Sequence, residues 1–165
     1  MTVDIQPVVY ADKLILRNLM ELYLYDFSEF DGMDVNAHGR FEYRYLDHYW
    51  TEAGRFPYFI RYDGRLAGFA LVRDIEGEEG EKVHRIAEFF ILRKYRRKGI
   101  GKDAAIWLFK HFGGKWQVEE LENNLPAQSF WRKVIGEITQ GKFQEKRIET
   151  WAGPVQEFVI NRDEG

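Results

Sequence analysis

The sequence of 165 residues has no cysteine, only four prolines and no strong excess of charge of one sign. Without cysteine, a disulfide scaffold, a thiolate zinc site and a thiol nucleophile are all excluded. No segment approaches the roughly 18 consecutive apolar residues of a transmembrane helix, so we expect no membrane partner. The 24 basic and 27 acidic residues give a net charge of −3, which argues against bulk electrostatic binding to nucleic acid.

Apolar side chains are plentiful, at 45% hydrophobic and 16% aromatic residues. A chain of this length usually forms one domain, and such a domain buries about 68–70% of its unfolded surface. We therefore expect a single domain over residues 1–165 with its own core. Residues 1–7 lack the basic and apolar regions of a signal peptide, so we expect a cytoplasmic location.

Apolar periodicity and turn residues predict alternating strands and helices. We expect strands at residues 3–9, 56–62, 66–74, 83–92, 116–121, 138–148 and 155–160. We expect helices at residues 12–27, 39–52 and 101–112, and a short helix that starts at Pro126. Asp63-Gly64 predicts a hairpin, and hairpins alternate with a strand–helix–strand unit. The pattern indicates an α/β fold of mixed α+β character, with a mostly antiparallel sheet of about seven strands and about four flanking helices.

The segment from Ala87 to Asp103 carries the strongest chemical signal. An apolar strand ends there, a basic loop turns, and Gly99 and Gly101 open a helix. Glycines let the backbone approach a ligand closely, and the first N–H groups of a helix have no partner within it. Together with the helix dipole, these groups form an anion site that often binds pyrophosphate. Six of the ten residues at positions 93–102 are Lys or Arg, which adds charge complementarity to phosphate.

Several kinds of site share these features. A P-loop is excluded, because it needs glycine where Arg96 stands and Ser or Thr where Asp103 stands. A dinucleotide fingerprint is met only loosely by Gly99, Gly101 and Ala104, since six residues separate the strand from the first glycine. The same residues would also suit a basic loop that merely solvates a helix start, or a patch for nucleic acid.

The motif Arg96-x-x-Gly99-x-Gly101 resembles the acyl-CoA loop of the GNAT superfamily of N-acetyltransferases. The longer string from Ile91 to Gly101 is similar to the strand-to-loop consensus of that family, and residues 124–131 are similar to its second motif. Sequence-specific resemblance covers residues 88–131. It implies a GNAT-like domain that uses acetyl-CoA as acyl donor, needs no metal and transfers the acyl group to an amine.

The resemblance also implies roles for three groups of residues. The end of the strand would bind the pantetheine arm through its backbone, at Phe90, Ile91 and Leu92. The loop would hold the pyrophosphate with Arg96, Arg97, Lys98, Gly99, Ile100, Gly101 and Lys102. The second motif would line the cofactor near its thiol with Asn124, Phe130 and Trp131, although Trp131 could equally be plain core.

The reaction implied is attack of a neutral amine on a thioester. A primary amine is mostly protonated at pH 7, so a base or a water path must accept a proton. Glu88 is our candidate base, because it lies on the cofactor strand four residues before the strand end. An exposed or salt-bridged strand residue is the alternative role for Glu88, and His84 is a second candidate base. A backbone N–H near Leu92 would stabilise the developing oxyanion.

Many family members place a tyrosine in the second motif to protonate the departing thiolate. Here Trp131 stands at that position, so the acid is unassigned. This departure motivates an alternative function, a non-catalytic acyl-CoA-binding or sensing module. A nucleic-acid-binding protein is the second alternative, although we expect no nucleic-acid partner.

The acceptor is expected to be a small-molecule or peptide amine, and a homodimer is the expected assembly. In this family the connection between the first two helices forms much of the acceptor wall. Here it holds the acids Asp26, Glu29, Asp31 and Asp34, with the aromatic residues Tyr25, Phe27 and Phe30 among them. Such a wall would suit a cationic acceptor such as a polyamine, an aminoglycoside or a peptide amine. A solvated acidic loop explains the same residues.

Overall fold

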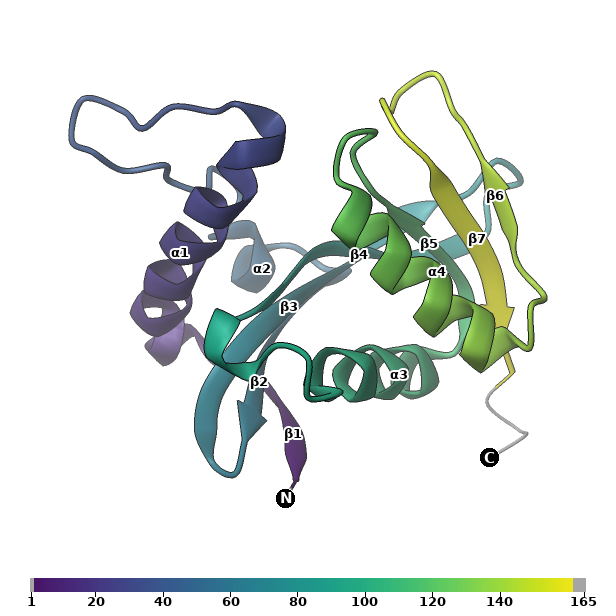
Figure 1. The fold of residues 1–165 in the computed structure, drawn as a ribbon, viewed down its shortest axis with the longest axis horizontal. Helices are drawn as coiled ribbons and strands as arrows, with labels where there is room; N and C mark the ends of the chain where they lie inside the picture. Colours follow the sequence, from purple (N-terminus) through teal and green to yellow (C-terminus); the bar gives the residue numbers. More distant parts are fainter. Residues whose placement is uncertain (1, 162–165) are drawn as a thin grey trace.

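The computed structural model describes residues 2–161, which form a seven-stranded sheet with helices on both faces (Figure 1). The strands are β1 (Val3–Pro7), β2 (Arg55–Tyr62), β3 (Arg65–Glu76), β4 (Lys82–Ile91), β5 (Gly114–Glu119), β6 (Gln144–Lys146) and β7 (Val155–Ile160). The helices are α1 (Lys13–Asp31), α2 (His48–Thr51), α3 (Ile100–Phe112) and α4 (Leu125–Thr139). The order across the sheet is β1-β2-β3-β4-β5-β7-β6. This confirms the predicted mixed α/β architecture.

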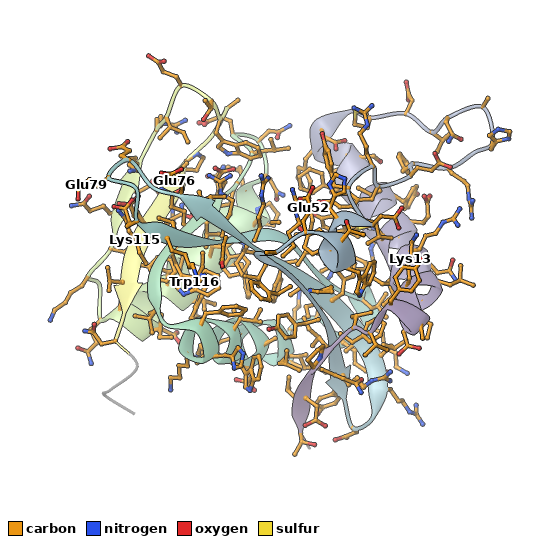
Figure 2. All side chains as sticks on the ribbon, turned by 180° about the vertical axis from the view of Figure 1, so that it is seen from behind. Lys13, Glu52, Glu76, Glu79, Lys115 and Trp116 are labelled. Atoms are coloured by element: carbon orange, nitrogen blue, oxygen red, sulfur yellow. The ribbon has the colours of Figure 1, made fainter. Side chains whose placement is uncertain are left out.

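Two apolar clusters, one on each face of the sheet, hold the helices in place. On one face, α3 and α4 cover a cluster that contains Phe109, Trp116 and Ile135. Trp116 points from β5 towards α3, where its ring meets Phe109 edge-on at 4.9 Å (Figure 2). On the other face, α1 packs Leu16 and Met20 against the sheet. No helix between residues 2 and 161 is both long and apolar enough to cross a bilayer.

The predicted helix at residues 39–52 is wrong over most of its length, since only His48–Thr51 is helical. Gly39 and Glu42 have positive φ values of 73° and 51°, which a right-handed helix does not allow. The side chain of Asn36 accepts hydrogen bonds from the backbone of His38 and Arg40 and so folds this segment as a turn.

The first helix is longer than predicted and ends at Asp31, where Gly32 follows with φ of 70°. Most of the acidic and aromatic residues that were expected in the connection after the first helix, from Tyr25 to Asp31, therefore belong to α1. Near the other end of the chain, α4 has fifteen residues and is not short. Its buried face continues to Thr139, so the strand predicted at residues 138–148 is reduced to Gln144–Lys146.

The site is positioned by the strands β4 and β5, which are parallel and pair over only three residues, from Val83–Lys115 to Arg85–Gln117. Beyond Arg85, β4 continues to Ile91 paired with β3 alone. The two strands therefore separate at their carboxyl ends, and backbone groups on one edge of β4 are left without a neighbouring strand.

A buried carboxyl group lies just after the end of β5. Glu120 is 3% exposed, and its Oε1 accepts a hydrogen bond of 2.8 Å from Nε2 of Gln156. Glu120 Oε2 and Gln156 Oε1 are buried without a protein partner. Burial raises the pKa of Glu120 to about 8. The group is therefore protonated at neutral pH, and its hydroxyl can serve as a donor.

We expect Glu120→Gln to make the protein more stable than the wild type at pH 9 and similarly stable at pH 4. The pKa of about 8 lies above the ordinary value of 4.5, so the folded wild type loses stability as pH rises from about 4.5 through 8. Glutamine keeps a donor at this position and cannot ionise. Thermal unfolding at both pH values checks this, with a difference of several degrees expected at pH 9. An equal pH dependence in both proteins would contradict it.

Candidate active site

The loop between β4 and α3 has the shape of an anion site. Tyr95 is buried beneath it, while residues 96–99 are exposed. Arg97 and Gly99 have left-handed φ values of 63° and 78°, and turns of this kind form concave sites for anions. The carbonyl of Gly99 accepts from the N–H of Asp103 at 3.0 Å. The N–H groups of the three residues between them therefore precede the first helical bond and point out of the helix start.

Several basic side chains of this loop already have protein partners. Arg96 donates through Nε to the carbonyl of Ile91 at 2.8 Å and through Nη2 to Asp26 at 2.9 Å. Lys102 forms an ion pair with Glu137 on α4. Of the predicted phosphate ligands, the backbone N–H groups and the exposed Arg97 and Lys98 face outward, and Arg96 keeps only the donors that its two protein partners do not use.

The structure brings three of the predicted cofactor residues together. A Cβ at Gly101 would lie 3.4 Å from the side chains of both Ile91 and Phe130. Phe130 in turn stacks on Phe89 of β4, with ring centres 5.9 Å apart. The loop, the end of β4 and α4 therefore meet at one place.

Two residues of the second motif have structural positions. Asn124 is the N-cap of α4, where its Oδ1 accepts from the N–H of Ala127 at 3.2 Å. Trp131 is 6% exposed and meets Phe89 edge-on at 5.0 Å, as expected of a core residue. Their contacts with a cofactor stay predictions.

Glu88 lies on the face of β4 that α1 covers. The residue is half-buried and its carboxylate is closely surrounded by protein, and Oε2 accepts a hydrogen bond from the hydroxyl of Tyr23 on α1. Burial raises the pKa of Glu88 to about 7, although hydrogen bonding by Tyr23 and Tyr43 works in the opposite direction. A carboxylate with this pKa is matched to accepting protons near neutral pH.

Tyrosine hydroxyls surround this carboxylate. Burial, followed by the negative charge of Glu88, raises the pKa of Tyr23, Tyr43 and Tyr49. All three are therefore neutral donors at pH 7. The guanidinium of Arg55 lies over the ring of Tyr49 at 5.5 Å. The hydrogen bond from Tyr23 fixes the Glu88 carboxylate without neutralising it.

Sequence reasoning missed these tyrosines. The apolar periodicity places Tyr23 on the buried face of α1, where a phenol needs a partner for its hydroxyl. This need for a partner was the available signal that Tyr23 contacts a polar group on the sheet. Tyr43 lies within the segment whose helix prediction is wrong, and nothing in the sequence points from it to Glu88.

His84, the second candidate base, lies near the start of β4. Its Nδ1 is 2.5 Å from Oδ1 of Asp74, and its ring packs against Phe112 and Trp116 on the α3 face. His84 and Glu88 therefore belong to opposite faces of the sheet. Within the part of the chain that the structure describes, no group of three or more His, Asp or Glu side chains could hold a metal ion.

Within residues 2–161, only some of the carboxylates in the predicted acidic wall are without a protein partner. The carboxylate of Asp26 is held by Arg93 and Arg96, and Asp31 accepts from the N–H of Met33 at 2.9 Å. Glu29 and Asp34 are exposed. The aromatic residues divide as well, because Tyr25 is 67% exposed whereas Phe27 packs on Tyr23 at 5.6 Å.

Parallel strands that separate before a glycine-containing anion loop at a helix start are the arrangement expected of a CoA-dependent acyltransferase. The model of the Acetyltransferase (GNAT) family matches residues 16–136. The chain belongs to this family. No curated protein matched the sequence.

Solved structures share the fold over nearly the whole chain. An acetyltransferase from Thermus thermophilus is 14% identical with a TM-score of 0.71, over 97% of this chain and 98% of that one. The PaiA N-acetyltransferase from Thermoplasma acidophilum, in complex with coenzyme A, is 13% identical with a TM-score of 0.61, over 97% and 100%. An aminoglycoside acetyltransferase from an uncultured soil metagenomic sample is 14% identical with a TM-score of 0.63, over 88% and 91%. At these identities the similarity concerns the fold.

Proposed function

We propose that this protein transfers the acetyl group of acetyl-CoA to a primary amine of a small-molecule or peptide acceptor, and that Glu88 is the general base. The observation that carries the proposal is the position of Glu88. This half-buried residue, whose carboxylate has a pKa of about 7, lies on the strand that parts from β5 and leads directly into the anion loop.

The described residues fit acetyl-CoA. The N–H groups of Ile100, Gly101 and Lys102 point out of the start of α3, and the space beside the Cα of Gly99 is open, with no atom within 4 Å of an added Cβ. The edge of β4 beyond Arg85 has no neighbouring strand and offers backbone groups to the amides of the pantetheine arm, although the carbonyl of Ile91 already accepts a hydrogen bond from Arg96. Phe130 lies beside Ile91 where β4 meets the start of α3, since a Cβ at Gly101 would lie 3.4 Å from both side chains.

Glu88 supplies the proton chemistry of the transfer. Bound acetyl-CoA provides a thioester, whose C–S bond breaks as the new N–C bond to the amine forms. The acceptor attacks as the neutral amine, the minor form of an alkylamine at pH 7. Glu88 accepts the proton that the nitrogen loses as the N–C bond forms, directly or through water. The thiol has an ordinary pKa of about 8.5, so it can leave as thiolate without a dedicated acid.

A cationic amine is the acceptor class that the site favours. Glu88 lies against α1, and Glu29 and Asp34 are exposed at and beyond the end of that helix. One structural neighbour, an aminoglycoside acetyltransferase, was solved in complex with the aminoglycoside sisomicin, an amine of this class. A panel of polyamines, aminoglycosides and peptide amines is the appropriate assay, and a protein that binds acetyl-CoA but releases no CoA with any of them would be a binding module.

We expect acetyl-CoA at a hundredfold excess over its Kd to add about 2.7 kcal/mol of stability, a melting shift of roughly 5–11 °C. Gly99→Val should abolish this shift, because it places a branched side chain in the open space of the loop. Gly64→Val is the matched control, since Gly64 has a φ of 79° against 78° for Gly99, equally open surroundings and a place in the β2–β3 turn. Both variants should lose similar basal stability, and only Gly64→Val should keep the shift. A wild type that does not respond to acetyl-CoA would overturn the proposal.

A further inference from the structure

Asp26 on α1 is bonded to two arginines of the cofactor loop. Its Oδ1 accepts from Arg93 at 2.8 Å and its Oδ2 accepts from Arg96 at 2.9 Å. Burial alone would raise the pKa of Asp26, but hydrogen bonds from the two arginines outweigh it and lower the pKa. The three side chains form a cluster with a net charge of +1.

The two guanidinium groups are fixed in orientation by these bonds. Arg96 is also held by the carbonyl of Ile91 at 2.8 Å, and its guanidinium lies over the ring of Phe90 at 5.7 Å. Arg93 would otherwise be loosely placed, because its side chain is 75% exposed. No described hydrogen bond uses Nη1 of either arginine, so each retains free donors.

The same helix is attached to the other side of the separated strands. The carbonyl of Phe30, one turn beyond Asp26, accepts from Nδ2 of Asn123 at 3.0 Å. Asn123 lies in the connection from β5 to α4, whereas Arg93 and Arg96 follow β4. The last turns of α1 are thus joined to the segments that follow both strands, and only the Asp26 attachment controls guanidinium groups.

We propose that Asp26 is a positioning residue that orients Arg93 and Arg96 to bind the phosphates of the acyl donor. This inference rests on the proposed function. A free arginine side chain carries about 2 kcal/mol of rotamer entropy, and ordering it during binding weakens affinity. Asp26 orders both side chains beforehand and leaves their remaining donors for phosphate oxygens.

The experiment compares two donors that differ in their phosphates. In Asp26→Asn the side chain keeps its shape but loses its charge, and one of the two arginines faces an amide donor. We expect its KM for acetyl-CoA to rise about tenfold, equivalent to about 1.4 kcal/mol. Its KM for acetyl-pantetheine, which has no phosphate, should change less than about twofold, and kcat with either donor should be nearly unchanged.

Two control variants separate positioning from a general effect on α1. Asn123→Ala removes the other attachment of the helix, and Asn18→Ala changes an exposed side chain about two turns earlier on α1; neither should change the ratio of the two KM values. An equal rise in both KM values for Asp26→Asn would show a merely structural role. A lower KM for acetyl-CoA would show that Asp26 competes with phosphate. Either result overturns the inference.

Calorimetry with CoA and with pantetheine distinguishes this inference from the proposed function. If the wild type binds CoA but turns over no amine, the proposed function fails. The selective loss of CoA affinity in Asp26→Asn would then still support the positioning role. If turnover is observed and the variant matches the wild type with both donors, only the inference fails.

Discussion

Glu88→Gln should lower kcat by roughly 100- to 10,000-fold, the usual contribution of a general base. Glutamine has nearly the same shape and can still accept the hydrogen bond from Tyr23, so the local packing is preserved. It cannot take a proton from the acceptor amine. The measurement is the release of CoA with the best amine found, at saturating concentrations of both substrates.

Loss of folding cannot explain such a result. Because the pKa of Glu88 is raised to about 7, charging this group costs the folded wild type stability between pH 4.5 and 7. The variant should therefore be at least as stable as the wild type at pH 8, and acetyl-CoA should still raise its melting temperature. If kcat remains within about threefold of the wild type, Glu88 is not the base.

The pH profile provides the second arm of this test. For the wild type, kcat/KM should rise with pH through a group of pKa about 7, as Glu88 loses its proton. Tyr23→Phe removes a hydrogen bond that lowers this pKa, so the rising limb should move to higher pH. A limb that stays in place, or moves to lower pH, would contradict this role of Tyr23.

Gly68→Ala should destabilise the protein by roughly 1–3 kcal/mol or more, a drop in melting temperature of roughly 2–12 °C. Gly68 lies on β3 opposite Ile91. A Cβ there would lie 1.9 Å from the carbonyl oxygen of Phe90, and backbone atoms of a central strand cannot move aside cheaply. Relief of the clash would displace the part of β4 that is proposed to bind the pantetheine arm, so acetyl-CoA affinity should fall as well.

Gly136→Ala is the matched control for this substitution. Gly136 lies inside α4, and its added Cβ would meet only Phe143 at an ordinary 3.8 Å. Alanine in a helix interior is favoured over glycine by about 0.5–1 kcal/mol, so this variant should be slightly more stable than the wild type. If the two variants have equal melting temperatures, the close approach at Gly68 is not what requires glycine.

The sequence predicted those parts of the protein that depend on local pattern. Strands, hairpins and the start of α3 follow from apolar periodicity and from glycines such as Gly64 and Gly99, whose conformations are local properties. The helix predicted before α2 was wrong because the aromatic residues of this segment share no common face and its turn is closed by the side chain of Asn36. The length of α4 was missed because its last apolar residues resemble a strand as much as a helix.

The candidate site was predictable only in part, for a different reason. Glu88 and the anion loop lie within one continuous segment, so their proximity could be inferred from the sequence. The partners that tune them come from elsewhere: Tyr23 is 65 residues away from Glu88, and Asp26 is 70 residues away from Arg96. No local pattern indicates such pairs, and only the packing of α1 on the sheet brings them together.

The early separation of β4 and β5 has a consequence for aggregation. An unpaired strand edge usually lies at the rim of a sheet, where it can recruit a strand of another chain. Here an unpaired edge lies in the middle of the sheet, between Arg85 and Ile91, with Phe130 and the attachment of α1 to Asn123 close by. A strand of another chain would have to enter between β4 and β5 to pair with this edge. The fold therefore leaves backbone groups unpaired at a place less open to strand addition than the rim of the sheet.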